Sequence, residues 1–127
     1  GGGAMPTWRT VFQGTLPAGP EEVLYDSPGD EASGELLSAL RVTFDGGSDA
    51  AAWDAAALQG VTLLLYVGDT TLPRARVRLA DLVRTPERPL NVARRPGDLL
   101  RLVLVDPEGR LAEKKPAVQI ELQARKT

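Results

Sequence analysis

The stretch from Arg94 to Gly109 constrains the fold of this chain more than any other. A Pro-Gly-Asp turn at residues 96–98 begins a strand here, and an Asp-Pro-Glu-Gly turn at 106–109 ends it. The strand is apolar on both faces, with Leu100, Leu102 and Leu104 on one, Leu99, Val103 and Val105 on the other, and Arg101 as its one charge. Such a strand must be covered on both sides, so we expect it in the middle of a packed sheet system.

A second nearly all-apolar strand is predicted at residues 61–67. Val61, Leu63, Leu65 and Val67 alternate there with Thr62, Leu64 and Tyr66, and a Gly-Asp-Thr-Thr turn follows. Further strands, several of them half-buried, are expected at residues 8–16, 21–25, 35–44, 76–82, 90–93 and 118–123. In the first of these, Trp8, Thr10 and Phe12 are expected to share one face, and in the last Gln119, Glu121 and Gln123 form a wet face.

One helix is expected, at residues 49–58, where alanine dominates, Ser48 can cap the start and Gly60 can end it. Seven or eight strands and one short helix predict an all-β fold, a two-layer antiparallel β-sandwich of jelly-roll-like type. A fold of alternating parallel strands and helices would need several long helices. Segments 26–34 and 111–116 have the composition of loops.

The chain of 127 residues fits one domain. Residues 1–5 are interpreted as a cloning scar, Gly-Gly-Gly-Ala, followed by the start Met5, and residues 6–127 as the sandwich domain. No apolar run approaches the roughly 18 residues that span a bilayer, and no signal-peptide core is visible. We therefore expect no membrane partner, and a location in a virion, outside the cell or, without a leader, in the cytoplasm.

The chemistry available to this chain is restricted because it contains neither cysteine nor histidine. Disulfides, thiolate nucleophiles, imidazole bases and the commonest metal ligands are thereby excluded. Asp45, Asp49 and Asp54 surround a Gly-Gly turn, but their spacing is not that of an EF-hand, and a helix start explains two of them. We expect no catalytic, cofactor or metal site. A small glycosidase or esterase built on loop carboxylates stays a third hypothesis.

Charge is unevenly distributed along the chain. Residues 1–69 carry ten acidic and two basic side chains, and residues 70–127 carry thirteen basic and seven acidic ones. The two halves either neutralise each other within the fold or form an acidic and a basic side suited to head-to-tail assembly. A net charge of −2 and few aromatics make nucleic acid a poor partner. Arginine outnumbers lysine twelve to three, which either a thermophilic or high-GC source or codon bias alone explains.

Six residues are candidates for an interface with another protein. They are Trp53, Arg74, Arg76, Arg78, Arg94 and Arg95. Trp53, a large ring on an alanine-rich helix, either plugs the core or anchors a partner, and the arginines either lie on solvated faces and loops or contact a partner. Trp53, Tyr25 and Tyr66 could instead be platforms of a carbohydrate-binding domain, although Trp8 and Tyr66 are expected on packed strand faces.

Three segments carry a resemblance to a known class of proteins. Residues 40–45, 61–67 and 95–102 read Leu-Arg-Val-Thr-Phe-Asp, Val-Thr-Leu-Leu-Leu-Tyr-Val and Arg-Pro-Gly-Asp-Leu-Leu-Arg-Leu. Their order resembles small β-sandwich proteins of tailed-phage particles, such as head-decoration, tail-tube and tail-adaptor proteins. The likeness covers about half of the chain, and the alanine-rich helix is an insertion in the pattern. It implies a virion structural protein that works by self-association or by clamping its neighbours. A non-catalytic assembly module is thus the leading hypothesis, and a carbohydrate-binding domain is the alternative.

Overall fold

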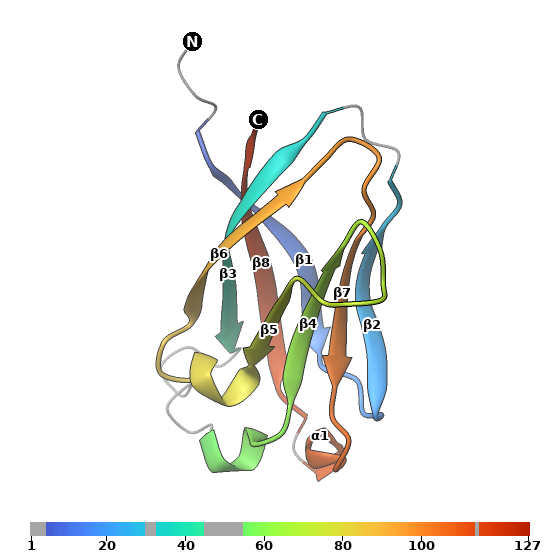
Figure 1. The fold of residues 1–127 in the computed structure, drawn as a ribbon. Coiled ribbons are helices and arrows are strands. Elements are labelled where there is room, and N and C mark those ends of the chain that lie inside the picture. Colours follow the sequence, from blue (N-terminus) through green and yellow to red (C-terminus); the bar gives the residue numbers. More distant parts are fainter. Residues whose placement is uncertain (1–4, 30–32, 45–54, 114) are drawn as a thin grey trace.

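The structure is a computed structural model that describes residues 5–29, 33–44, 55–113 and 115–127 (Figure 1). Its strands are β1 (Thr7–Thr15), β2 (Glu21–Ser27), β3 (Glu35–Phe44), β4 (Thr62–Val67), β5 (Ala75–Arg78), β6 (Glu87–Arg94), β7 (Leu100–Val105) and β8 (Ala117–Lys126). They form two four-stranded antiparallel sheets, sheet A with the order β1-β8-β3-β6 and sheet B with the order β2-β7-β4-β5. The predicted all-β, two-layer antiparallel sandwich is confirmed.

The two strands with apolar residues on both faces occupy the centre of sheet B. β7 lies between β2 and β4, and β4 lies between β7 and β5. Leu100, Leu102 and Leu104 point from β7 into the space between the sheets, where each is fully buried. Burying a side chain of this size stabilises the fold by about 1.5–3 kcal/mol. A central position is therefore the one that these strands can occupy at low free energy.

The central strands of sheet A have one apolar and one polar face. Val118, Ile120 and Leu122 of β8 are buried in the core, while the residues between them are only half-buried. β3 pairs with β8 so that Leu40 lies opposite Leu122 and Arg41 lies opposite Glu121. The predicted wet face of the last strand is thus confirmed, and it belongs to the outer side of sheet A.

The first strand differs from its prediction because it contains a β-bulge. The register of β1 against β8 shifts between Thr10 and Phe12, so Val11 is an extra residue on β1. Beyond the bulge Phe12 lies opposite the buried Ile120, whereas Trp8 lies opposite Gln123 on the outer side. The prediction that Trp8, Thr10 and Phe12 share one face is wrong, because a single inserted residue reverses the alternation.

Other strand boundaries also differ from their predictions, including that of the last strand, predicted at 118–123, which extends to Lys126. The strand predicted at 76–82 ends at Arg78 and continues as the 3-10 helix η3 (Leu79–Leu82), whose three-residue period buries both Leu79 and Leu82. The short strand predicted at 90–93 is part of the longer β6, which includes Pro89. β6 is an edge strand, and proline is tolerated there because its missing N–H group can face the open side of the sheet. β2 extends past Tyr25 to Ser27.

The helical segments are short. Of the helix predicted at 49–58, the structure describes the 3-10 helix η2 (Ala55–Leu58); the rest, including Ser48, Asp49 and Trp53, lies outside the described residues. An unpredicted helix, α1 (Arg110–Glu113), follows β7. The buried carboxylate of Asp106 begins it, accepting hydrogen bonds from the backbone N–H groups of Arg110 and Leu111 at 2.9 Å each. Within the described ranges, no helix has the length and apolar character needed to cross a membrane.

Candidate interaction surface

The outer face of sheet A is mainly polar, with Trp8 and Leu36 as its large apolar side chains among the described residues, and several of its polar side chains bind one another. Arg41 of β3 forms an ion pair with Glu121 of β8 at 3.0 Å, and its guanidinium carbon lies 4.0 Å from the centre of the Trp8 ring. Gln119 of β8 donates a hydrogen bond to the Thr10 hydroxyl of β1 at 3.1 Å. Covering this face with a partner would mean desolvating groups that are already paired within the sheet.

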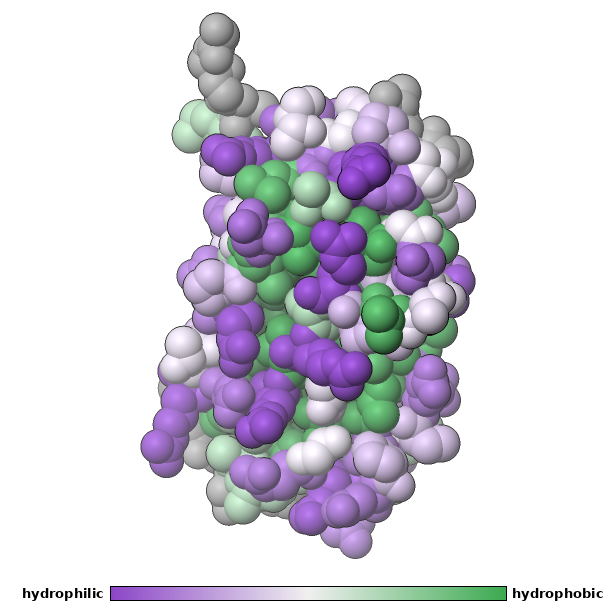
Figure 2. Space-filling view, viewed as in Figure 1, coloured by the Kyte–Doolittle hydropathy of each residue, from purple (hydrophilic) through white to green (hydrophobic). Residues whose placement is uncertain are grey.

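The outer face of sheet B has a different composition. Strand pairing places its outward residues in three rows, each crossing the sheet from β2 towards β5. The rows are Glu21–Val105–Thr62–Arg78, then Val23–Val103–Leu64–Arg76, then Asp26–Arg101–Tyr66. Figure 2, drawn from the side of sheet B, shows hydrophobic residues among hydrophilic ones on this face.

The middle row makes the centre of this face apolar. Val23 on the edge strand β2 is 54% exposed. Val103, the next residue in the row, points outward on β7 and is nevertheless only 3% exposed. Leu64 and the neighbouring Tyr66 are half-buried. These four residues, which we call the sheet B strip (Val23, Val103, Leu64 and Tyr66), follow one another across β2, β7 and β4 on the outer side of sheet B. Val103 is covered within the molecule, where the exposed loop 68–74 crosses in front of β7 (Figure 1).

The two edges beside the sheet B strip carry opposite charges. Glu21 and Asp26 lie on β2, and Asp26 is paired with Arg101 of β7 at 3.2 Å. At the opposite edge, Arg76 and Arg78 of β5 are both exposed. The charge asymmetry of the sequence therefore appears within one sheet, because β2 comes from the acidic half of the chain and β5 from the basic half. An apolar centre between charged edges is typical of protein–protein interfaces.

The structure brings three of the six predicted interface residues together and separates the others. Arg76 and Arg78 lie on β5, and Arg74, also exposed, directly precedes it. Arg95 is exposed in the turn before β7, where its backbone N–H donates to the Asp98 carboxylate at 3.0 Å. Trp53 lies outside the described residues. Nothing in the sequence indicated that Val23 and Leu64, rather than Trp53, form the apolar centre of a surface.

Arg94 was predicted to lie on a solvated face or loop or to contact a partner, and both alternatives are wrong because the residue is buried. Its side chain is 3% exposed and lies between the two sheets, where it contacts Glu35 of β3 at 3.2 Å and the Ser27 hydroxyl of β2 at 3.2 Å. It also donates to the carbonyl oxygen of Asp98 at 2.9 Å. Arg94 is inward because it follows the buried Val92 by two residues on β6. That period-two spacing was the signal in the sequence that could have placed it correctly.

Glu35 is the carboxylate on which this cluster depends. Besides Arg94 it accepts a hydrogen bond from Arg9 of β1 at 2.8 Å. Burial raises the pKa of Glu35, but the hydrogen bonds and charges of Arg9 and Arg94 outweigh that effect, so its pKa lies below the ordinary value. The cluster of Arg9, Glu35, Arg94 and Ser27 joins strands of both sheets. Its geometry indicates a structural role, because it links the two sheets at one end of the sandwich.

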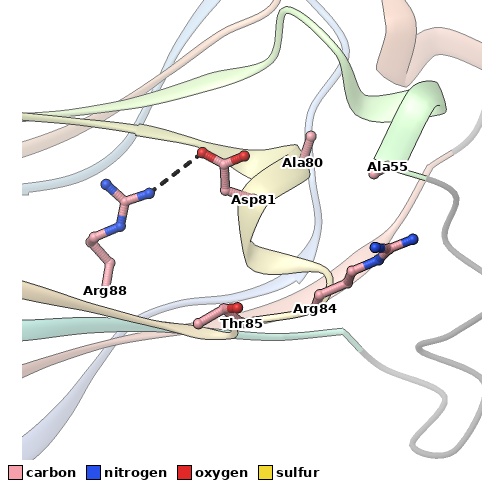
Figure 3. A pocket seen from close by; sticks show the side chains of 6 residues that line it. All are labelled: Ala55, Ala80, Asp81, Arg84, Thr85 and Arg88. Atoms are coloured by element: carbon pink, nitrogen blue, oxygen red, sulfur yellow. Dashed lines mark hydrogen bonds and ion pairs between the residues drawn. The ribbon is translucent and has the colours of Figure 1, made fainter.

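A hollow lies beside the short helices η2 and η3 (Figure 3). It is lined by Ala55, Ala80, Asp81, Arg84, Thr85 and Arg88. Arg88 points to Asp81 and binds it at 3.4 Å, while Arg84 extends the other way, toward Ala55. Asp81 is the one carboxylate among these lining residues, so they lack the paired carboxylates of a glycosidase.

Two further tests of chemistry concern metals and sugars. Among the described residues, no three acidic side chains lie close enough together to hold a metal ion. Of the predicted sugar platforms, Tyr25 packs against the core, Tyr66 is half-buried on the outer side of β4, and Trp53 lies outside the described residues. The Arg41 guanidinium lies over one face of the Trp8 ring. No protein-family model matches this chain, and neither a curated protein nor a solved structure matches it.

Proposed function

We propose that this protein is a non-catalytic β-sandwich assembly module that associates with copies of itself through the outer face of sheet B. The observation that carries the proposal is the contrast between the two outer faces. Sheet A presents paired polar groups, and sheet B presents the sheet B strip between an acidic and a basic edge. Apolar area yields free energy when a partner removes it from water, whereas paired polar groups yield little.

The resemblance to small β-sandwich proteins of tailed-phage particles supports the same proposal. Such proteins work by contact with their neighbours, and this chain would do so in a virion. In a particle, many copies are held at a high local concentration, so each contact can be weak and the assembly still stable. A surface with an apolar centre of modest size fits that requirement.

The proposal is tested with one substitution on each outer face. Val23→Lys places a charge in the sheet B strip, and Thr43→Lys places one at an exposed position of β3 in sheet A. Sedimentation equilibrium over a wide concentration range should show the wild-type chain associating and Val23→Lys weakening that association at least about tenfold. Thr43→Lys should leave it unchanged.

Two outcomes would contradict the proposal. One is a wild-type chain that stays monomeric at the highest concentration reached. The other is an equal effect of both substitutions, which would mean that the outer face of sheet B has no special part in association. Circular dichroism of each variant verifies that the fold is intact, as expected for exposed positions.

A further inference from the structure

We infer that copies of this chain join head to tail, with the β2 end of the sheet B strip on one copy entering the hollow beside η2 and η3 on the next. This inference rests on the proposed function and names the surface of the second copy that meets sheet B. In the contact, Val23 lies in the hollow and Arg84 of the second copy binds the carboxylate of Glu21. The position, the shape and the charge of the two surfaces support it.

The β2 end is the part of the sheet B strip that a second molecule can reach. Loop 68–74 crosses in front of β7 (Figure 1), and Val103 on that strand is only 3% exposed. β2 lies beyond β7 at the edge of the sheet, where Val23 is 54% exposed and Glu21 is also exposed. These two residues point outward from alternate positions of one strand, about 7 Å apart. A partner therefore meets a small aliphatic side chain beside a carboxylate.

The hollow offers the complementary groups. Its volume of about 590 Å³ lies in the range of sites that hold ligands. Ala55 and Ala80 are half-buried in its lining and supply small apolar surfaces. Arg84 is exposed and forms no hydrogen bond or ion pair with any residue that the structure describes, whereas Arg88 is bound to Asp81 (Figure 3). Alanines beside an available guanidinium suit a valine beside a carboxylate.

The charges of the two surfaces favour contact between unlike sides. β2 carries Glu21 and Glu22, while Arg76 and Arg78 of β5 lead into η3 and Arg84 follows it. Two hollows facing each other would bring arginines together, and two β2 strands would bring carboxylates together. Like charges cost free energy and opposite charges gain it, so the hollow of one copy attracts the β2 end of another.

The two surfaces lie on opposite sides of the molecule. β2 and β5 are the two edge strands of sheet B, and η3 follows β5 directly. In Figure 1, β2 begins at the lower right, and the helical turns of η2 and η3 lie at the lower left. A neighbour placed beside the molecule therefore brings its β2 to the hollow. Each copy keeps one surface of each kind for a further neighbour, so the contact closes into a ring or extends as a filament.

The experiment exchanges the charges of Glu21 and Arg84, both exposed, and measures association by sedimentation equilibrium. Each single variant, Glu21→Arg or Arg84→Glu, puts like charges at the contact, and its dissociation constant should rise at least about tenfold. The double variant and an equimolar mixture of the two single variants restore opposite charges and should return to within about threefold of the wild type. Arg125→Glu makes the same charge change at an exposed position of β8 in sheet A and should leave association unchanged.

The size of the assemblies tests the head-to-tail arrangement. The wild type and the mixture should both exceed the mass of a dimer at high concentration, because every end keeps a surface for another copy. Association that stops at a dimer would overturn the inference, as would an Arg84→Glu variant that associates like the wild type or a double variant weaker than either single one. If Val23→Lys still weakens association in these cases, the proposed function stands and only the contact with the hollow fails. A wild-type chain that stays monomeric would remove both.

Discussion

The two outer faces of this sandwich differ although the inner faces are alike. Both sheets bury aliphatic side chains toward one core. On the outside, sheet A pairs its charges internally, as Arg41 does with Glu121, while sheet B exposes Val23 at the β2 end of an apolar row. A face whose polar groups are already paired gains little free energy from a partner, whereas an apolar face with charged edges is suited to bind a second molecule.

The largest expected effect distinguishes the inner from the outer side of sheet B. Leu102→Ala removes a fully buried side chain and should lower the free energy of unfolding by about 2–5 kcal/mol. Leu64→Ala, on the outer side of β4, should lower it by only about 1 kcal/mol, because that side chain is half-buried. Urea denaturation measures both. Equal losses would mean that the outer face of sheet B is already packed within one molecule.

The next prediction separates two arginines that are adjacent in the sequence. Arg94→Met should lower the free energy of unfolding by about 2 kcal/mol, because it removes the ion pair with Glu35 and the hydrogen bond to Ser27 inside the sandwich. Arg95→Met, in an exposed turn, should leave the melting temperature unchanged. Neither should alter association. A loss of association in Arg94→Met without a loss of stability would contradict the position of Arg94 between the sheets.

A pH titration tests the same cluster with a smaller effect. Because the pKa of Glu35 is lower in the folded state than its ordinary value of 4.5, its contribution to stability is present above that value and is lost as the pH falls through the folded-state pKa. The wild type should therefore lose stability on acidification below about pH 4.5. Glu35→Gln should lose less over that interval in parallel urea denaturations. An unchanged slope in Glu35→Gln would show that other carboxylates dominate.

The smallest expected effects come from removing one arginine on each outer face, which should change stability in sheet A and association in sheet B. Arg41→Ala in sheet A should lower the free energy of unfolding by about 0.5–1 kcal/mol, since it loses a half-exposed ion pair and the contact with Trp8, and should leave association unchanged. Arg76→Ala in sheet B should weaken association about threefold and leave the melting temperature unchanged. If both variants changed only stability or only association, the proposed difference between the two outer faces would be wrong.

The fold could be predicted from the sequence where the pattern of residues is regular. The strands containing Leu102 and Leu63 were placed correctly because apolar residues on both faces require a central position. The alternation of β8 predicted its wet face. Trp8 and Phe12 were wrongly predicted to share one face, because the bulge in β1 between them could not be seen in the sequence. Arg94 was misplaced for another reason: its spacing of two residues from the buried Val92 was in the sequence but was not used.

The candidate surface was predicted only in part. The arginines of β5 were named as interface candidates from their charge, but the apolar row beside them includes Val23 and Leu64, which are separated by forty-one residues in the chain. They lie in one row only because β7 pairs with both β2 and β4. No local pattern contains that information, because it arises from the order of the strands.

The sequence by itself determined that the protein is a sandwich and which two strands lie at the centre of a sheet, since the alternation of side chains along a strand is a local property. It also determined that negative charge precedes positive charge along the chain. The tertiary structure alone decided that these charges lie at opposite edges of sheet B, with the sheet B strip between them. The physical reason is that strand order results from packing between distant segments, whereas the pattern of a single strand depends only on its own residues.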